Sequence, residues 1–387
     1  MTLKRYRLMI PGPVDVDPEV LAEMGAPVGV HYGPEWTAVY NETLDLLKRV
    51  FQTEGDVVLI VGSGSAGLDA AIGSVVGDGE KKALVLINGF FGERLLAITH
   101  AYTHRVQAAT FDLDEPIAVE AVEEALRQEG DIAAVIAVHV ETSTGVLNPI
   151  QELGALCKRY GALLIVDAVS SLGGVELDVD GWGVGICVGA TQKCLEAPPG
   201  LSPVAVSEQA WELIEATHTP GWYLNLRTWK EYSKRWVDWH PHPVTVSTNT
   251  TLALKRSLER ILDEGLEMRF DRHKWATSFL RQGMRNLGFK PFVEDDRHAA
   301  PTVTAVRVDE RISAARLIQF LKERHRISIS GGIEDLRGSI FRVGHMGPGA
   351  TSEAILPLLF AIEEELREAG ADLPVGQSLY GIENKME

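Results

Sequence analysis

The sequence has few cysteines, a shortage of positive charge and no long apolar run. Its three cysteines, Cys157, Cys187 and Cys194, show no CxxC or metal-ligand spacing, which disfavours a disulfide framework and a metal site. Lys and Arg number 37 against 54 Asp and Glu, so the net charge is −17. A nucleic-acid surface needs a basic face, and anionic lipid attracts positive charge. We therefore expect neither nucleic acid nor a membrane among the partners.

From its residues we expect no targeting signal at the N-terminus of this sequence. Residues 1–10 include basic side chains without a sustained apolar core, and Pro11-Gly12-Pro13 comes directly after them. No apolar run approaches the roughly 20 residues that a membrane-spanning helix needs. An odd number of cysteines without a disulfide framework suits a reducing compartment. The sequence therefore predicts a cytoplasmic protein.

Apolar residues, by contrast, make up 45% of the 387 positions, enough for a large core and for two domains. Between residues 56 and 206, short apolar runs alternate with helical patterns, which predicts an α/β fold with a mostly parallel sheet and helices on both faces. The expected strands are 57–61, 83–87, 106–111, 132–139, 163–166, 186–189 and 202–206, and the expected helices are 66–76, 91–101, 118–127 and 149–160.

The flanking regions complete the predicted organisation. We expect helices at 17–24 and 40–51, a segment without clear period at 218–242, and a long helical pattern from 250 to about 287. A strand at 302–308, a helix at 314–323, a glycine turn at 331–332, a strand at 340–343 and a helix at 353–369 complete the chain. These patterns predict an N-terminal arm (1–18), a large domain (19–250) and a small α/β domain (251–387).

Two buried runs carry the residues around which we expect the site to form. Asp167 follows the run 163–166, and Lys193 follows the run 185–189. Ligands of open α/β sheets lie outside the carboxyl ends of the strands, so the two could meet there although they are 26 positions apart (193 − 167). A pyridoxal phosphate enzyme needs such a pair: the lysine forms a Schiff base, and the acid keeps the pyridine nitrogen protonated. An ordinary salt bridge is the alternative.

A glycine-rich turn at residues 62–67 follows one strand and opens a helix with a GxGxxG pattern. A dinucleotide site would need an acid at the end of the next strand, which ends in Ile87-Asn88-Gly89 instead. Backbone N–H groups at a helix N-terminus still attract anions, and Ser63 and Ser65 add hydroxyl donors. The turn is therefore predicted as a phosphate cradle, with a plain strand-to-helix turn as the alternative.

Other strand ends point to the same edge of the sheet. Phe91 could stack on a flat cofactor ring, although core packing is the commoner fate of phenylalanine. Residues 139–145 (His-Val-Glu-Thr-Ser-Thr-Gly) offer hydroxyl donors there. The loop 29–36 carries a histidine and two aromatic residues, and a ligand-holding loop and a plain turn are equally open. Four strand ends, which carry glycine-serine, aromatic, hydroxyl and carboxylate groups, thus meet at one edge of the predicted sheet near Lys193. Their convergence is a more specific signal than any one of them alone.

Three segments resemble the class V aminotransferases: 167–171 (Asp-Ala-Val-Ser-Ser), 191–200 (Thr-Gln-Lys-Cys-Leu-Glu-Ala-Pro-Pro-Gly) and 341–347 (Phe-Arg-Val-Gly-His-Met-Gly). Within that class, the chain is most similar to the alanine–glyoxylate and serine–pyruvate aminotransferases. The resemblance extends from Pro11 through the last long helix. It implies fold type I, pyridoxal 5′-phosphate as cofactor, and a homodimer whose active sites lie at the subunit interface.

The resemblance also implies roles for single residues. Lys193 would be the Schiff-base lysine and Asp167 the partner of the pyridine nitrogen. Further cofactor-binding residues would be Ser63, Gly64, Ser65 and Gln192 at the phosphate, Phe91 where the family usually has a stacking tryptophan, Thr142 near the ring oxygen, and Ser171. Thr245 and His242, the latter in place of a common tyrosine, would reach the neighbouring subunit's phosphate. Arg342 would bind the substrate carboxylate, and Gly12 and Tyr32 are further substrate-binding candidates.

The activity implied is transfer of an amino group from alanine or serine to glyoxylate or pyruvate. A cysteine desulfurase would have a histidine where Gln192 stands, and no suitable loop cysteine is present. A pyridoxamine–pyruvate aminotransferase would look similar around Lys193, but the glycine-serine turn favours a bound phosphorylated cofactor. A ureidoglycine–glyoxylate aminotransferase is only weakly excluded. The presence of both Lys193 and Asp167 disfavours a non-catalytic binding module.

Overall fold

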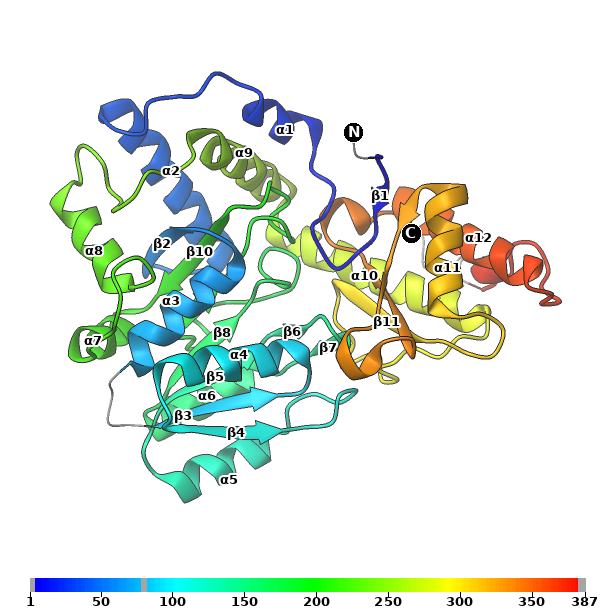
Figure 1. Cartoon of the computed structure of the whole chain (residues 1–387), viewed down its shortest axis with the longest axis horizontal. Helices are drawn as coiled ribbons and strands as arrows, with labels where there is room; N and C mark the ends of the chain where they lie inside the picture. Colours follow the sequence, from blue (N-terminus) through cyan, green and yellow to red (C-terminus); the bar gives the residue numbers. More distant parts are fainter. Residues whose placement is uncertain (1–3, 78–81, 382–387) are drawn as a thin grey trace.

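A seven-stranded sheet is the centre of the larger part of the molecule (Figure 1). The computed structural model describes residues 4–77 and 82–381. The sheet has the order β2-β10-β9-β8-β5-β3-β4, in which β10 runs antiparallel to β2 and β9 while the other pairs are parallel. Its strands are β2 (Asp56–Val61), β3 (Lys82–Ile87), β4 (Val106–Thr110), β5 (Ile132–Val138), β8 (Leu163–Asp167), β9 (Ile186–Val188) and β10 (Leu201–Val206). The predicted fold class and strands are confirmed.

Helices cover both faces of this sheet because successive strand residues point to opposite sides. In β8, Leu164 and Val166 join one core cluster, whereas Leu163 and Ile165 join the other. The first cluster includes residues of α2 (Pro34–Phe51), α5 (Val119–Glu129), α6 (Ile150–Tyr160) and α9 (Thr248–Glu264). The second includes residues of α3 (Gly64–Val76), α4 (Phe90–Tyr102), α7 (Glu208–Ala216) and α8 (Leu226–Arg235).

The C-terminal part is built on a smaller antiparallel sheet with the order β11-β14-β13. Its elements are α10 (Leu266–Asn286), β11 (Val303–Arg307), α11 (Ala314–Phe320), a π-helix (Leu321–His325), β12 (Ile327–Ser328), β13 (Ser330–Gly331), β14 (Ile340–Gly344) and α12 (Ser352–Glu368). The strands expected at 302–308 and 340–343 and the helices expected at 314–323 and 353–369 are confirmed, the end of the first helix being the π-helix. The glycine turn expected at 331–332 is wrong for Gly331, which belongs to β13 and pairs with Phe341.

The N-terminal arm reaches across to this C-terminal part, as the blue trace in Figure 1 shows. Its strand β1 (Arg7–Leu8) pairs in parallel with β12. The helix α1 (Pro18–Met24) begins where expected, because the side chain of Asp17 accepts a hydrogen bond from the Glu19 amide at 2.8 Å. A short hairpin of β6 (Val140–Glu141) and β7 (Val146–Leu147) comes after β5.

The expected helix from 250 to 287 is wrong, because the chain forms two helices there. Gly265 separates α9 from α10 with a φ of +86°, a conformation that a residue with a Cβ rarely adopts. The buried side of α9 packs on the core of the large sheet, whereas α10 belongs to the core of the C-terminal part. The domain boundary near residue 250 stays a prediction. Residues 1–3 and 382–387 of the predicted arm and small domain lie outside the described residues.

Two other helices differ from expectation. The helix α2 begins at Pro34, not at residue 40, because proline favours the first helical position and Trp36 is already on the buried side. The segment 218–242, for which the sequence predicts no period, contains α8. The side chain of Asn225 caps α8 by accepting from the Arg227 amide at 3.1 Å, and Leu226 and Trp229 are buried. Because so few apolar residues lie on its inner face, α8 shows no clear helical period of apolar residues in the sequence.

Among the helices of residues 4–77 and 82–381, none is long and apolar enough to cross a membrane.

Candidate active site

Lys193 lies in the turn after β9, against the N-terminal arm. Its Nζ donates a hydrogen bond to the main-chain oxygen of Pro11. A Cβ placed on Gly12 would lie 2.4 Å from Cδ of Lys193 and 2.8 Å from its Nζ, so any other residue at this position would force the lysine side chain or the arm to move. Burial lowers the pKa of Lys193 to about 8. A substantial share of the amine is therefore neutral, and nucleophilic, at mildly alkaline pH.

Asp167 ends β8 on the same edge of the sheet, where its side chain is buried. Its Oδ1 accepts a hydrogen bond from the Val169 amide at 2.9 Å. Burial raises the pKa of Asp167 to about 6, and the Val169 amide and the positive charge of Lys193 oppose that rise. Near neutral pH Asp167 is thus mainly a buried carboxylate on which the charge of Lys193 acts, although no ion pair within 4.0 Å joins the two side chains in the described part of the chain.

The glycine-rich turn packs against both of these segments. A Cβ on Gly64 would lie 2.7 Å from Cγ2 of Val169, just after Asp167, and 3.1 Å from Cβ of Ala190, just before Lys193. The helix α3 starts at this turn, and the Ser63 side chain does not cap it. The Ala66 amide donates to the Ser63 oxygen at 2.8 Å, whereas the Gly64 and Ser65 amides stand at the start of α3, where the helix itself offers no acceptor and an anion can bind.

Gln192 contributes a buried amide beside Lys193. Within the part of the chain that the structure describes, its Oε1 has no hydrogen-bond partner. Its main-chain oxygen accepts from the Val14 amide at 3.1 Å, which holds the arm at this point. An unpaired buried polar atom is costly, so the Gln192 side chain is suited to a ligand partner.

Phe91, Thr142 and Arg342 lie around the same crevice. Arg342 on β14 is buried, and it donates from Nη1 to the Thr142 main-chain oxygen at 2.8 Å and from Nε to the Gly331 oxygen at 2.9 Å. Burial lowers its pKa. Within the described residues, its Nη2 has no hydrogen-bond partner. Arg342 therefore links the C-terminal part to the large sheet while one donor face remains available.

Hydroxyl groups line the region between Asp167 and Arg342. Thr142 Oγ1 lies 3.4 Å from Ser170 Oγ, and Ser171 Oγ lies 3.0 Å from Nδ1 of His139. Burial lowers the pKa of His139 to about 3, so this histidine is neutral at physiological pH. Ser171 and His139 therefore form an uncharged pair behind the crevice.

His242, Thr245 and Tyr32 are not brought to Lys193 within this chain. The Trp36 indole donates to Nε2 of His242 at 2.8 Å, and Nδ1 of His242 lies 2.6 Å from the Val244 oxygen. A phosphate contact by His242 would require the loss of one of these bonds. Tyr32 is 48% exposed, with its ring 5.8 Å from that of Trp239, and Thr245 is exposed. Their predicted ligand contacts stay predictions.

Three residues that the sequence interpretation missed bear on the site. The Arg94 guanidinium lies 4.9 Å from the Phe91 ring centre, and its charge acts on both Asp167 and Lys193. Arg269 is buried and donates from Nη2 to the Cys194 oxygen at 2.8 Å. Glu141 is fully buried beside Phe91. The motif at 139–145 contained Glu141, but for the two arginines no local pattern signalled a contact with distant segments.

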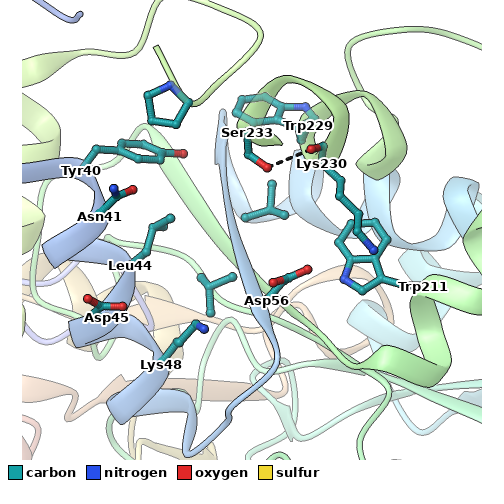
Figure 2. A pocket seen from close by; sticks show the side chains of 13 residues that line it. Tyr40, Asn41, Leu44, Asp45, Lys48, Asp56, Trp211, Trp229, Lys230 and Ser233 are labelled. Carbon is teal, nitrogen blue, oxygen red and sulfur yellow. Dashed lines mark hydrogen bonds between the residues drawn. The ribbon is translucent and has the colours of Figure 1, made fainter. Parts of the chain in front are cut away.

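A pocket of about 380 Å³ lies along the edge strand β2 and is lined by none of the predicted site residues. Figure 2 shows Tyr40, Leu44 and Lys48 of α2 on one side of Asp56, and Trp211 and Lys230 on the other. The Lys230 ammonium lies 4.1 Å from the Trp211 ring centre, a cation–π contact that stabilises its charge. Lys193, Asp167 and Arg342 therefore all lie outside this pocket.

Sequence comparison identifies relatives over nearly the whole chain. The family model described as "Aminotransferase class-V" matches residues 22–337. An uncharacterized aminotransferase of Methanocaldococcus jannaschii is 41% identical, with 95% of this chain and 94% of that protein covered. An alanine–glyoxylate aminotransferase of Callithrix jacchus is 33% identical, with 94% and 87% covered.

Solved structures agree with this similarity. The ureidoglycine–glyoxylate aminotransferase of Bacillus subtilis superposes with a TM-score of 0.91 at 32% identity, covering 98% of this chain and 97% of that one. The pyridoxamine–pyruvate aminotransferase of Mesorhizobium loti superposes with a TM-score of 0.92 at 30% identity, covering 97% and 96%. The chain is a transaminase that belongs to the class V aminotransferase family.

Proposed function

We propose that this protein is a pyridoxal phosphate-dependent aminotransferase that moves an amino group from alanine or serine to glyoxylate or pyruvate. The observation that carries the proposal is that Lys193 follows β9 and the buried carboxylate of Asp167 ends the neighbouring parallel strand β8, so that the charge of each acts on the other. The family membership supports the reaction class, and the substrate pair is our inference.

The donor set of the crevice fits pyridoxal phosphate. Lys193 would hold the aldehyde, Asp167 the pyridine nitrogen, and the amides and hydroxyls of residues 63–65 the phosphate. The buried Oε1 of Gln192 has no partner in the described chain, and a Cβ on Gly64 would fill the space of the turn. When bound, this cofactor supplies an electron sink for negative charge on the carbon that bears the amino group.

The chain's own residues would orient the substrate and move its protons. The lowered pKa of Lys193 makes its amine suited to take a proton from the substrate carbon and to deliver it to the C4′ carbon of the cofactor. The Arg342 guanidinium would bind the substrate carboxylate through a planar two-donor fork. Phe91 would support one face of the cofactor ring, and Thr142 and Ser171 would complete the polar wall.

Desulfuration of cysteine is the less supported alternative. All three cysteines are fully buried, and burial raises the thiol pKa of Cys157 and Cys194 to about 12 and that of Cys187 well above its ordinary value. A buried thiol is a poor nucleophile because it is not ionised at neutral pH. Gln192 also stands where a desulfurase would have a histidine. Pyridoxamine–pyruvate and ureidoglycine–glyoxylate transfer remain the rival reactions.

We also propose that the active protein is a homodimer. Five aromatic rings, the aromatic ladder, follow one another at centre distances of 5.8, 5.4, 4.5 and 5.8 Å in the order Tyr32, Trp239, Trp236, Tyr232 and Trp222. Tyr32, Trp239 and Trp222 are 48–50% exposed. A contiguous exposed apolar surface of this kind favours association with a partner. A second copy would cover it and bring Thr245 to the neighbouring site.

Half-reactions with single amino acids test the proposed substrates. The purified protein with pyridoxal phosphate should be yellow, and alanine or serine should convert its absorbance to that of the amine form. Glyoxylate or pyruvate should then restore the original spectrum. Conversion only by pyridoxamine, ureidoglycine or cysteine would contradict the proposed substrate pair. A protein that stays colourless with added pyridoxal phosphate would overturn the enzyme assignment itself, and Lys193→Ala serves as the inactive control.

A further inference from the structure

The helix α4 has no N-terminal cap of its own. Its N-cap residue is Gly89, which has no side chain, and a Cβ there would lie 2.4 Å from Cγ of Glu141. The amides of Phe91 and Gly92 instead donate to Oε2 of Glu141, at 3.0 and 3.2 Å. A carboxylate from a different segment therefore caps the helix that carries Phe91, and it also complements the positive end of the helix dipole.

The other carboxylate oxygen holds the turn after β6. The amide and the hydroxyl of Ser143 both donate to Oε1 of Glu141, the amide at 3.0 Å. The Ser143 hydroxyl oxygen in turn accepts from the Phe90 amide at 3.1 Å. The Glu141 side chain is fully buried. Glu141 thus joins the first turn of α4 and the turn at 141–144 into one rigid unit.

This unit also supports Arg342. Thr142 lies between Glu141 and Ser143, and its main-chain oxygen accepts from Nη1 of Arg342 at 2.8 Å. The negative charge of Glu141 favours the charged form of Arg342. The position of the arginine therefore depends on the same turn that Glu141 holds.

We propose that Glu141 is a positioning residue that aligns the Phe91 ring with the cofactor and the Arg342 guanidinium with the substrate carboxylate. The inference rests on the proposed function, because it takes the roles of Phe91 and Arg342 from it. Glu141 touches neither ligand in this assignment. It acts through the α4 amides on one side and through Thr142 on the other.

The test compares Glu141→Gln with Glu363→Gln. Glu363 is a solvent-inaccessible carboxylate that accepts from the amides of Gly376 and Ser378 and from the Ser378 hydroxyl, and it also pairs with Arg367 at 2.6 Å, but it lies in the C-terminal part. In either variant, the glutamine side chain keeps one acceptor oxygen but replaces the other with an NH₂ group, which cannot accept a hydrogen bond from the N–H groups around it. Both variants should lose thermal stability, which makes Glu363→Gln a control for a purely structural effect.

Only Glu141→Gln should change the ligand readouts. We expect its affinity for pyridoxal phosphate, measured by equilibrium dialysis, to fall roughly 10- to 100-fold, as for loss of hydrogen bonds to a charged group. The visible circular dichroism of the bound cofactor should weaken, and the dissociation constant of propionate, an unreactive carboxylate, should rise by a similar factor. Ser143→Ala, a milder change in the same unit, should show a smaller shift in the same direction.

Wild-type affinities and cofactor dichroism in Glu141→Gln, with lowered thermal stability alone, would overturn the positioning role. If Glu141→Gln does not fold, wild-type readouts in Ser143→Ala would overturn it equally. Failure of the proposed function is distinguishable, because the wild-type protein itself would then bind no pyridoxal phosphate.

Discussion

The Lys193 amine donates a hydrogen bond to the main-chain oxygen of Pro11, a residue 182 positions earlier in the chain. The same arm also contacts β14, which carries Arg342, because the Gly344 amide donates to the Met9 oxygen at 2.8 Å. Residues 9–12 therefore lie between the lysine turn and the C-terminal part. The arm is thus a wall of the crevice and not a loose extension.

Gly12→Ala should impair cofactor attachment. Gly12 has a φ of +93°, and a Cβ there would lie 2.4 Å from the Lys193 side chain, so the arm or the lysine must move. We expect at least a tenfold loss of pyridoxal phosphate affinity, since a displacement of about 1 Å can cost 100-fold in a catalytic site. Gly370→Ala is the matched control, because Gly370 has a φ of +96° with nothing within 4 Å. Equal cofactor affinities in the two variants would contradict the prediction.

Attachment of pyridoxal phosphate to the cofactor-free protein should accelerate as pH rises through about 8 and level off roughly one pH unit higher. The pKa of Lys193 is lowered from 10.5 to about 8, so its neutral amine appears at lower pH than that of an ordinary lysine. The rate of the absorbance change, followed from pH 6 to 10, should therefore have its midpoint near 8. Lys193→Ala should show no such phase. A rate that still rises steeply at pH 10 without levelling off would show that burial does not perturb this amine.

Arg342→Lys should weaken carboxylate binding far more than cofactor binding. Lysine lacks the planar fork and cannot keep both bonds to Thr142 and Gly331. We expect KM for the amino acid to rise on the order of 10- to 100-fold, the effect of a lost charged hydrogen bond. Arg281→Lys is the control, because Arg281 is buried and also donates to a main-chain oxygen, that of Val293, at 2.8 Å. It should lower stability but leave KM unchanged.

Asp167→Asn should change how the stability of the cofactor-free protein depends on pH. The pKa of Asp167 is raised in the folded state from 3.8 to about 6, so the folded state binds this proton more tightly than the unfolded state. Its stabilising contribution is complete below pH 3.8 and is lost as pH rises through 6, by about 3 kcal/mol for roughly two pKa units. Urea unfolding from pH 4 to 7 should show this loss in the wild type relative to Asp167→Asn. Parallel curves for the two proteins would contradict it.

Truncation of the aromatic ladder should weaken the proposed dimer. Trp239→Ala removes a half-exposed ring that lies between Tyr32 and Trp236 on the surface that a second copy would cover. Sedimentation at decreasing concentration should show dissociation at higher concentrations than for the wild type, by on the order of tenfold or more if Trp239 is an interface anchor. Phe360→Ala is the control, because Phe360 is 41% exposed but lies on α12. A monomeric wild-type protein would contradict the proposal.

The sequence predicted the strand-helix alternation well because that signal is local. Apolar runs such as 163–166 are buried on both faces of a parallel sheet, and residues directly after such strands must lie on one edge. The same local reasoning failed at Gly265, where one glycine ended a helix inside a long apolar pattern. It also failed at α8, because only a few of its residues face the core.

By itself, then, the sequence determined the fold class, the family resemblance, and the placement of Asp167 and Lys193 at strand ends. These follow from periodicity and from motifs a few residues long. Only the tertiary structure decided that Gly12 packs against Lys193, that Glu141 caps the helix of Phe91, and that Arg342 donates to Thr142. Each of these contacts joins residues far apart in the chain, and no local pattern encodes such a contact, because it depends on how the packed elements meet.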